Sequence, residues 1–215
     1  IQYFSNDQIT DNITWGKFMR KGIFESSHPH QVYFEETLEQ SLNHVLCELK
    51  ELNILVATNT SLADSAAMQR IKNILKPQNV IICTGLKAHS PRNDVIKVSK
   101  ILRENNINIT LGLGGGSVCD TLKVANIGAT NGFNCIEDID QLKEEKQFRP
   151  PQSKLIALPT TLSAGEFTCF AGITDERVPA KEVFFNKQLP PSVIILDPWL
   201  TLDTPDRLFF GTGVR

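Results

Sequence analysis

The sequence lacks any apolar run near the roughly 20 residues that a membrane-spanning helix requires, so it does not predict a bilayer-crossing protein. It also lacks an excess of one charge, since 22 Lys and Arg stand against 24 Asp and Glu, giving a net charge of −2. Nucleic acids and acidic membrane surfaces attract basic proteins, so we expect neither as a partner. The opening stretch, IQYFSNDQITDN, is too polar for a secretory signal. These absences favour a cytoplasmic protein.

Cysteine pairs at metal-binding spacing are also missing. The five cysteines form no C-x-x-C pair and are odd in number; they are Cys47, Cys83, Cys119, Cys135 and Cys169. A disulfide framework and a thiolate zinc site are therefore both poorly supported, and we expect buried free thiols. His28 and His30 flank a proline with no carboxylate or cysteine cluster nearby, so they are expected in a solvated loop and predict no metal site.

What the chain does contain is a regular alternation of apolar runs and amphipathic segments. The apolar runs have strand length and span residues 31–35, 54–58, 80–85, 109–114, 154–159 and 192–197. Segments with helical spacing lie between them, at residues 37–52, 65–75, 93–105 and 117–129. Continuous apolar strands separated by such helices are typical of a parallel sheet covered on both faces. The pattern predicts a doubly wound, Rossmann-like α/β domain, with residues 141–151 as a charged surface loop.

Three consecutive glycines follow the strand at 109–114, in the stretch ITLGLGGGSVCDTLKVANI. The unpaired N–H groups of a helix start, at the positive end of the helix dipole, suit a phosphate or pyrophosphate. Glycine lets a phosphate approach the main chain, and Ser117 can add a hydroxyl. Asp120 lies in the first turn, where an acidic side chain favours the helix start. The loop matches neither a Walker A loop nor the usual G-x-G-x-x-G spacing, and a tight turn without a ligand is the alternative.

A second loop, PTTLSAGEFT at residues 159–168, is crowded with hydroxyl groups after a buried strand. Thr160, Thr161, Ser163 and Thr168 fall within ten residues. Turn formation and helix capping explain one or two such residues. The whole set is more typical of a ligand surface, and the loop is expected at the same sheet edge as the glycines.

These stretches resemble the iron-containing alcohol dehydrogenases, a family that includes the maleylacetate reductases. The resemblance rests on GGGSVCDTLK, PTTLSAGEFT, AGITD, a lone lysine at 181 and VIILDPWLTLDTPDRLFFGTGVR, in the order and spacing of that family. It implies an N-terminal nucleotide-binding domain and a C-terminal helical domain that carries the metal. This chain resembles the first domain. We expect residues 1–30 to form a polar N-terminal segment or edge element, 31–197 the NAD(P)-binding domain and 198–215 the junction to an absent helical domain.

The resemblance also assigns residues to the cofactor, NAD or NADP. Gly115, Gly116 and Ser117 are expected to contact the pyrophosphate, and Lys181 to reach the ribose or nicotinamide. The remaining expected cofactor-binding residues are Asn59, Ser90, Asp120, Thr160, Thr161 and Thr168. A surface lysine in a charged loop is the alternative for Lys181.

Asn59 departs from the family pattern. After the strand ILVAT the family usually has an aspartate that hydrogen-bonds the adenosine ribose. A carboxylate there repels the 2′-phosphate of NADP, whereas an amide does not. The resemblance therefore leaves the choice between NAD and NADP open.

The family's metal, iron or zinc, is not supported by this sequence. Counting from Asp197-Pro198, the first metal-ligand position falls on Arg215. A guanidinium stays cationic and does not coordinate a divalent cation. The maleylacetate reductases also lack the aspartate there, which makes them the closer branch by pattern.

Three functions follow as hypotheses. The first is an NAD(P)-dependent dehydrogenase or reductase acting on a small alcohol, aldehyde or keto acid, with this chain inactive alone. The second is a non-catalytic nucleotide-binding fragment or remnant. The third is a sugar- or polyol-phosphate enzyme of the related dehydroquinate-synthase-like fold, against which the stretch DPWLTLDTP argues. Association into a homodimer stays open.

Overall fold

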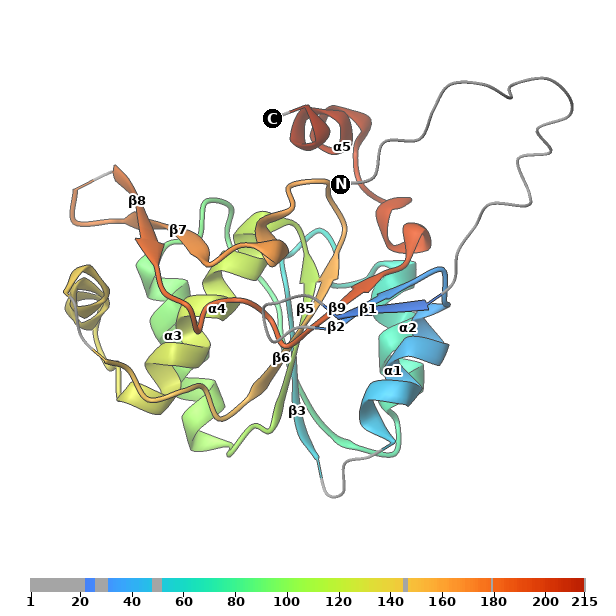
Figure 1. Cartoon of the computed structure of the whole chain (residues 1–215), viewed down its shortest axis with the longest axis horizontal. Helices are drawn as coiled ribbons and strands as arrows, with labels where there is room; N and C mark the ends of the chain where they lie inside the picture. The colour runs from blue at the N-terminus through green and yellow to red at the C-terminus, as the bar shows by residue number, and fades with distance from the viewer. Residues whose placement is uncertain (1–21, 26–30, 48–51, 145–146, 179, 215) are drawn as a thin grey trace, which may run out of the picture.

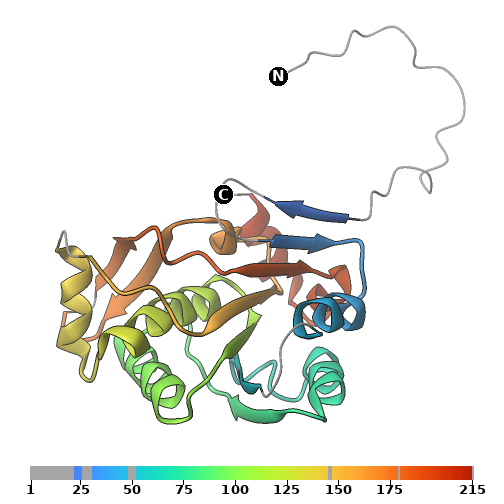
Figure 2. The same cartoon turned by 60° about the horizontal axis from the view of Figure 1, so that its bottom comes forward.

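The computed structural model describes residues 22–25, 31–47, 52–144, 147–178 and 180–214. Its centre is a seven-stranded sheet with strand order β1-β2-β9-β6-β5-β3-β4, in which only β1 is antiparallel to its neighbour. Figure 2 shows β1 at the edge of this sheet. The strands are β1 Gly22–Glu25, β2 Gln31–Phe34, β3 Asn53–Thr58, β4 Asn79–Cys83, β5 Ile109–Gly114, β6 Lys154–Pro159 and β9 Val193–Leu196. The expected mostly parallel sheet is confirmed.

Two helices cover each face of the sheet (Figure 1). On one face lie α1 (Leu38–Leu46) and α2 (Ala66–Leu75), and on the other α3 (Arg92–Glu104) and α4 (Gly116–Asn131). Each face has its own core of buried aliphatic side chains. All residues of β5 are buried, because helices cover both sides of this central strand. This is the doubly wound arrangement that the alternating pattern predicts.

The chain changes direction across the sheet between β3 and β5. From β3 it continues outward to β4 and then returns to form β5 on the other side of β3. Thr58, the last residue of β3, pairs with Leu113 of β5, and its hydroxyl donates to the Leu113 carbonyl over 2.8 Å. In open α/β sheets a crevice for ligands forms at the carboxyl ends of such a strand pair. The glycine triplet and Asn59 both lie there.

Several elements were not predicted from the sequence. They are the hairpin of β7 (Phe170–Asp175) and β8 (Ala180–Phe185), the 3-10 helices η2 (Ile136–Lys143), η3 (Gly165–Phe167) and η4 (Pro198–Thr201), and α5 (Asp206–Gly213). The edge strand β1 falls within residues 1–30, where a polar segment or edge element was expected. The prediction of a plain charged loop over 141–151 is wrong. Its first residues complete η2, and Phe148 is buried edge-on against Phe133, with ring centroids 6.2 Å apart.

Helix α1 is shorter than the expected 37–52 helix. A capping box at Thr37 starts it, and Cys47 forms its C-cap, while residues 48–51 lie outside the described part of the chain. All five cysteines are free thiols, but Cys47 and Cys135 are exposed, so the expectation of burial is wrong for these two. None of the helices in the described ranges has the length and apolar character needed to cross a membrane.

Candidate functional site

The glycine triplet forms the turn from β5 into α4. Gly115 is the N-cap residue of this 16-residue helix, with extended backbone angles of φ −84° and ψ −168°. The first N–H groups of a helix have no intrahelical acceptor and lie at the positive end of its dipole. Gly114 has φ +156°, and a Cβ there would lie 2.6 Å from Cγ2 of Val118. The turn therefore requires glycine at 114 and presents unpaired donors at the strand-switch crevice.

The loop of residues 160–168 packs directly against this turn. A Cβ at Gly115 would lie 2.9 Å from the Thr161 hydroxyl, and one at Gly116 would lie 3.0 Å from the Ser163 hydroxyl. The glycine-rich turn and the hydroxyl-rich loop, which were predicted separately, thus lie in contact with each other. The close approach that explains these two glycines includes a protein loop, so a side chain at 115 would displace Thr161 whether or not a phosphate binds.

Thr161 carries a buried hydroxyl that has no partner. The residue is 7% exposed, and its Oγ1 makes no hydrogen bond with any described residue. A buried polar group left unpaired costs about 1–3 kcal/mol, so such groups usually meet a ligand or water. The Thr168 hydroxyl differs, because it donates to the Gly165 carbonyl over 3.0 Å. Thr160 is buried, and its main-chain N–H donates to the Gly114 carbonyl over 3.1 Å.

Lys123 of α4 holds this loop in place, a role that the sequence reading missed. Its side chain is fully buried, and its ammonium donates to the carbonyl oxygens of Gly165 (2.5 Å), Thr168 (2.9 Å) and Phe170 (2.8 Å). The available signal was a lone charged residue in a mostly apolar stretch of helix, LKVANI. A lysine on such a buried face must find oxygen partners, because an unpaired buried charge is very costly.

Asp120 and Lys181 both lie close to Gly172 in β7. The Asp120 carboxylate accepts from the Gly172 N–H over 3.0 Å, and a Cβ at Gly172 would lie 3.0 Å from the Lys181 ammonium. Burial raises the pKa of Asp120 above its usual range, although the nearby charges of Lys123 and Lys181 act in the opposite direction. Glu166 of η3, which was also missed, is 5% exposed, and burial raises its pKa. The structure thus gathers two carboxylates and two lysines beside the hydroxyl-rich loop.

Ser90 supports the glycine turn through a hydrogen bond to Ser117. Its hydroxyl is fully buried and donates to the Ser117 carbonyl over 2.8 Å, while the His89 N–H donates to the Ser117 hydroxyl over 3.0 Å. His89 and Ser90 both have positive φ, at 64° and 51°, which is an unfavourable backbone for such residues. Thr174 offsets this strain by bonding both carbonyls. These contacts of Ser90 position the glycine turn, and the expected contact of Ser90 with the cofactor stays a prediction.

Asn59 follows β3 at the crevice, level with the glycine turn. It is half-buried, and its Oδ1 accepts from the Ser61 hydroxyl and from the Leu62 N–H, both over 2.9 Å. These bonds form the turn that leads toward α2. An aspartate would accept the same two bonds, so the turn itself does not require an amide.

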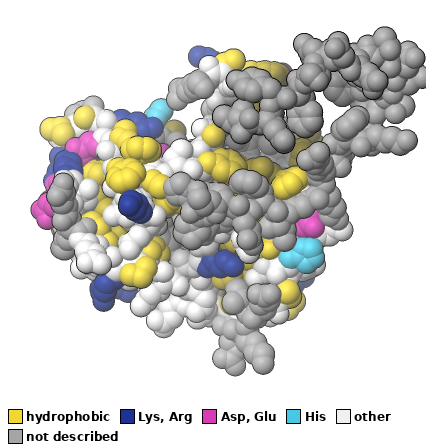
Figure 3. Space-filling view, in the orientation of Figure 1, with side chains coloured by type: hydrophobic (Ala, Val, Ile, Leu, Met, Phe, Trp, Pro, Cys, Tyr) yellow, Lys and Arg dark blue, Asp and Glu magenta, His cyan; other side chains and the backbone are white. Residues whose placement is uncertain are grey.

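An open cavity of about 380 Å³ adjoins Thr161, between the 159–167 loop, the end of β9 and α5. Its walls are largely apolar, with Leu162, Phe167, Leu196 and Phe209 among them. The Leu162 N–H donates to the Thr212 hydroxyl of α5 over 3.1 Å, which fixes one wall. Apart from Ile82, the large hydrophobic side chains exposed in the described ranges belong to residues 162–214. Figure 3 shows hydrophobic side chains on the upper part of the face that is also seen in Figure 1.

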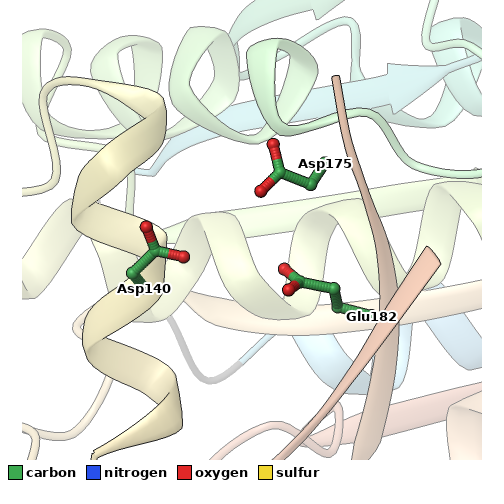
Figure 4. A group of neighbouring side chains, drawn as sticks. All are labelled: Asp140, Asp175 and Glu182. Atoms are coloured by element: carbon green, nitrogen blue, oxygen red, sulfur yellow. The ribbon is translucent and has the colours of Figure 1, made fainter. Parts of the chain in front are cut away.

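Three carboxylates converge beside α3, as Figure 4 shows: Asp140, Asp175 and Glu182. Their oxygens lie within 4.8 Å of one another, which is compatible with a metal site. The centre is instead occupied by the fully buried Arg92, whose Nη2 lies 2.7 Å, 3.4 Å and 2.5 Å from the three carboxylates, respectively. A guanidinium already supplies the cation, so this group does not fit a metal. It ties the β7–β8 hairpin to η2 and α3.

The described residues offer no other group of three such side chains that could hold a metal ion. His28, His30 and Arg215, which the sequence reading weighed, lie outside the described ranges.

Residues 29–198 match the sequence model of the family described as iron-containing alcohol dehydrogenase. The chain is 31% identical to a dehydrogenase of Gibberella moniliformis over 78% of this chain and 42% of that protein. It is 27% identical to alcohol dehydrogenase 4 of Saccharomyces cerevisiae over 86% of this chain and 48% of that protein. The chain thus spans less than half the length of these relatives.

The fold is similar to that of a sulfoacetaldehyde reductase from Bifidobacterium kashiwanohense, whose crystal structure is a complex with NAD+. The TM-score is 0.77 at 23% identity, covering 88% of this chain and 50% of that one.

Proposed function

Because the chain belongs to the iron-containing alcohol dehydrogenase family, we propose that it is the nucleotide-holding part of an oxidoreductase for a small alcohol, aldehyde or keto acid. The cofactor is NAD or NADP, which when bound supplies or accepts the hydride. The observation that carries the proposal is the unpartnered Thr161 hydroxyl, buried beside the first N–H groups of α4. The family match favours this hypothesis over the sugar- or polyol-phosphate alternative.

In this proposal the start of α4 holds the pyrophosphate. The main-chain N–H groups of Gly116 and Ser117 donate to its oxygens, and the Thr161 hydroxyl adds a further donor. Lys181, exposed on β8 and close to Asp120, supplies a positive charge at the ribose or nicotinamide side. The cavity beside Thr161 offers an apolar wall for the reacting end of the cofactor.

Replacing Thr161 by valine separates binding from folding. Valine keeps the shape of threonine and removes the unpaired hydroxyl, so the unfolding free energy should stay unchanged or rise by about 1 kcal/mol. The affinity for NAD(P)H should nevertheless fall by about tenfold, because a phosphate donor is lost. Fluorescence titration and urea unfolding measure the two effects.

Thr110→Val is the matched control. The Thr110 hydroxyl is buried and bonded to the Ser153 hydroxyl over 2.7 Å, in the body of β5. Its removal should lower stability by about 1 kcal/mol and leave cofactor affinity unchanged. An unaltered affinity in Thr161→Val would refute the assignment of this hydroxyl to the cofactor.

Asn59→Asp should shift the cofactor preference toward NADH. The carboxylate would accept the same bonds from Ser61 and Leu62, so the turn is preserved. It would repel the 2′-phosphate of NADPH, and we expect the ratio of NADH to NADPH affinity to rise by about tenfold. Titrations of both nucleotides against wild type and variant measure this ratio. If the ratio does not move, Asn59 is remote from the ribose.

We further propose that residues 31–197 form the nucleotide-binding domain and that residues 198–215 connect it to a further domain. The exposed hydrophobic side chains of residues 162–214 support this division, because apolar surface of this kind usually faces a partner or another domain. A homodimer and a likeness to the maleylacetate reductase branch stay predictions, tested by sedimentation and by the substrate profile of the longer protein.

The 215-residue chain by itself should bind NAD(P)H without turning over substrate. Hydride transfer requires the nicotinamide and the carbonyl to be held in contact with water excluded, whereas the cavity beside Thr161 is open. Assays of NAD(P)H oxidation against small aldehydes and keto acids, with metal analysis of untagged protein, check this expectation. Turnover above buffer, or stoichiometric iron or zinc, would show that the chain builds a complete site.

A further inference from the structure

We propose that a second cavity, at the amino ends of β6 and β9, binds a small organic anion that carries a hydroxyl or amino group beside its carboxylate or phosphate. The cavity has a volume of about 350 Å³, within the range of small-molecule sites. It lies between α4, the 150–155 segment and the 187–192 loop. Ser153 and Ser192 immediately precede the two strands, so the cavity is at the opposite sheet edge from the glycine turn.

A buried amide without partners carries the inference. Asn126 of α4 is 3% exposed and lines the cavity, and neither its Nδ2 nor its Oδ1 makes a hydrogen bond with a described residue. Gln188, in the facing loop, donates to the Phe148 carbonyl over 3.1 Å, but its buried Oε1 has no partner. Leaving such groups unpaired is costly, and together they offer both donors and acceptors to one occupant. An occupant with a hydroxyl or amino group satisfies both kinds.

The charges around the cavity select an anion. Among the described residues its lining includes Lys123, Lys154 and Lys187 and no aspartate or glutamate. The Lys123 ammonium is held by three loop carbonyls and lies 3.9 Å from the Asp120 carboxylate, so it offers the cavity no open donor, and the positive charge available to a ligand is that of Lys154 and Lys187. Lys154 and Lys187 form no salt bridge within the described ranges, and their flexible side chains lie at the cavity wall. An anionic group is thus drawn to these two lysines while its polar arm reaches Asn126.

Four probes separate the chemistry of the occupant. The probes form two pairs. Malate carries one hydroxyl that succinate lacks, and glycerol 3-phosphate carries a glycerol group that inorganic phosphate lacks. We expect malate or glycerol 3-phosphate to bind with a dissociation constant of about 1 mM or lower. The matching compound without the hydroxyl-bearing group, succinate or inorganic phosphate, should bind about tenfold more weakly. Calorimetry measures the affinities, and the side-chain amide signal of Asn126 in NMR spectra reports its contact. Saturating NADH should not displace the probe, because the cavity and the glycine turn lie at opposite edges of the sheet.

Two variants test the residues. Asn126→Leu fills the same space without polar atoms and should abolish binding, and Lys154→Gln combined with Lys187→Gln should weaken it by at least tenfold at low salt. Lys100→Gln, an exposed lysine of α3, is the control and should have no effect. The double variant changes only partly or fully exposed side chains, so it tests the site even if Asn126→Leu does not fold.

Three results would overturn the proposal. The first is that none of the probes binds wild type at up to about 10 mM. The second is that the probe is displaced by NADH and is insensitive to the lysine variant, which would place it at the glycine turn. The third is that Asn126→Leu is more stable than wild type and no probe alters either protein, which would mean that water alone fills the cavity.

Discussion

Arg92→Met is expected to lower the free energy of unfolding by about 3–5 kcal/mol, because it removes the central cation from a buried charge network. Arg92 is fully buried, and its guanidinium contacts the carboxylates of Asp140, Asp175 and Glu182. Asp175 is itself 2% exposed, and without Arg92 its buried carboxylate would keep only the Arg177 ion pair among its described cationic partners. Urea unfolding of wild type and variant measures the difference. Arg207→Met, at an exposed position of α5, is the control and should change stability by less than about 0.5 kcal/mol.

The same network predicts a dependence on pH. Hydrogen bonds from Arg92 lower the pKa of Asp140 below its usual range, those from Arg177 lower the pKa of Asp175 to about 2, and Lys143 and Arg92 lower that of Glu182. Folded-state pKa values below the unfolded ones stabilise the protein above about pH 4–5, and this stabilisation is lost as the pH falls toward 2. The Arg92→Met deficit should therefore be larger at pH 7 than at pH 3. An equal deficit at both pH values would contradict the role assigned to these carboxylates.

The network also shows why the β7–β8 hairpin escaped prediction. The central strands were found because continuous apolar runs such as ITLGLG are buried on both faces. In β8 the sequence AKEVFF exposes most of its residues and contains two charges, so it has no apolar run to detect. The hairpin is held to the domain by side chains far apart in sequence, Arg92 and Glu182 among them. Sequence periodicity carries no information about such partners.

The candidate site was predicted only in outline for the same reason. Residue types and order located both loops, because glycines and hydroxyls mark a strand–helix turn and the loop that faces it. The use of each hydroxyl depends on its tertiary neighbours. The Ser90 hydroxyl donates to the Ser117 carbonyl, and the Thr168 hydroxyl donates to the Gly165 carbonyl. The Thr161 hydroxyl has no partner among the described residues. These three outcomes cannot be told apart in the sequence, and the resemblance assigned them one role.

Lys123→Met is expected to cost about 3 kcal/mol of stability and at least tenfold in NAD(P)H affinity. The substitution keeps an unbranched apolar stem in the core of α4 but removes the ammonium that three main-chain carbonyls share. Those carbonyls belong to Gly165, Thr168 and Phe170 and would be left without this donor. The 160–168 loop would then lose its main anchor to α4, and Thr161 would no longer be held against Gly115.

The two effects are measured separately. Urea unfolding gives the stability, and fluorescence titration at a temperature where the variant is fully folded gives the affinity. Lys100→Met makes the same chemical change at a side chain that is 64% exposed and lies 3.7 Å from Glu104, so it should alter stability by less than about 0.5 kcal/mol and affinity not at all. If Lys123→Met is destabilised but binds NAD(P)H as wild type does, the lysine supports the core and the loop does not form the cofactor site. If both properties change, the buried ammonium positions the residues that hold the nucleotide, since it contacts the loop through main-chain oxygens.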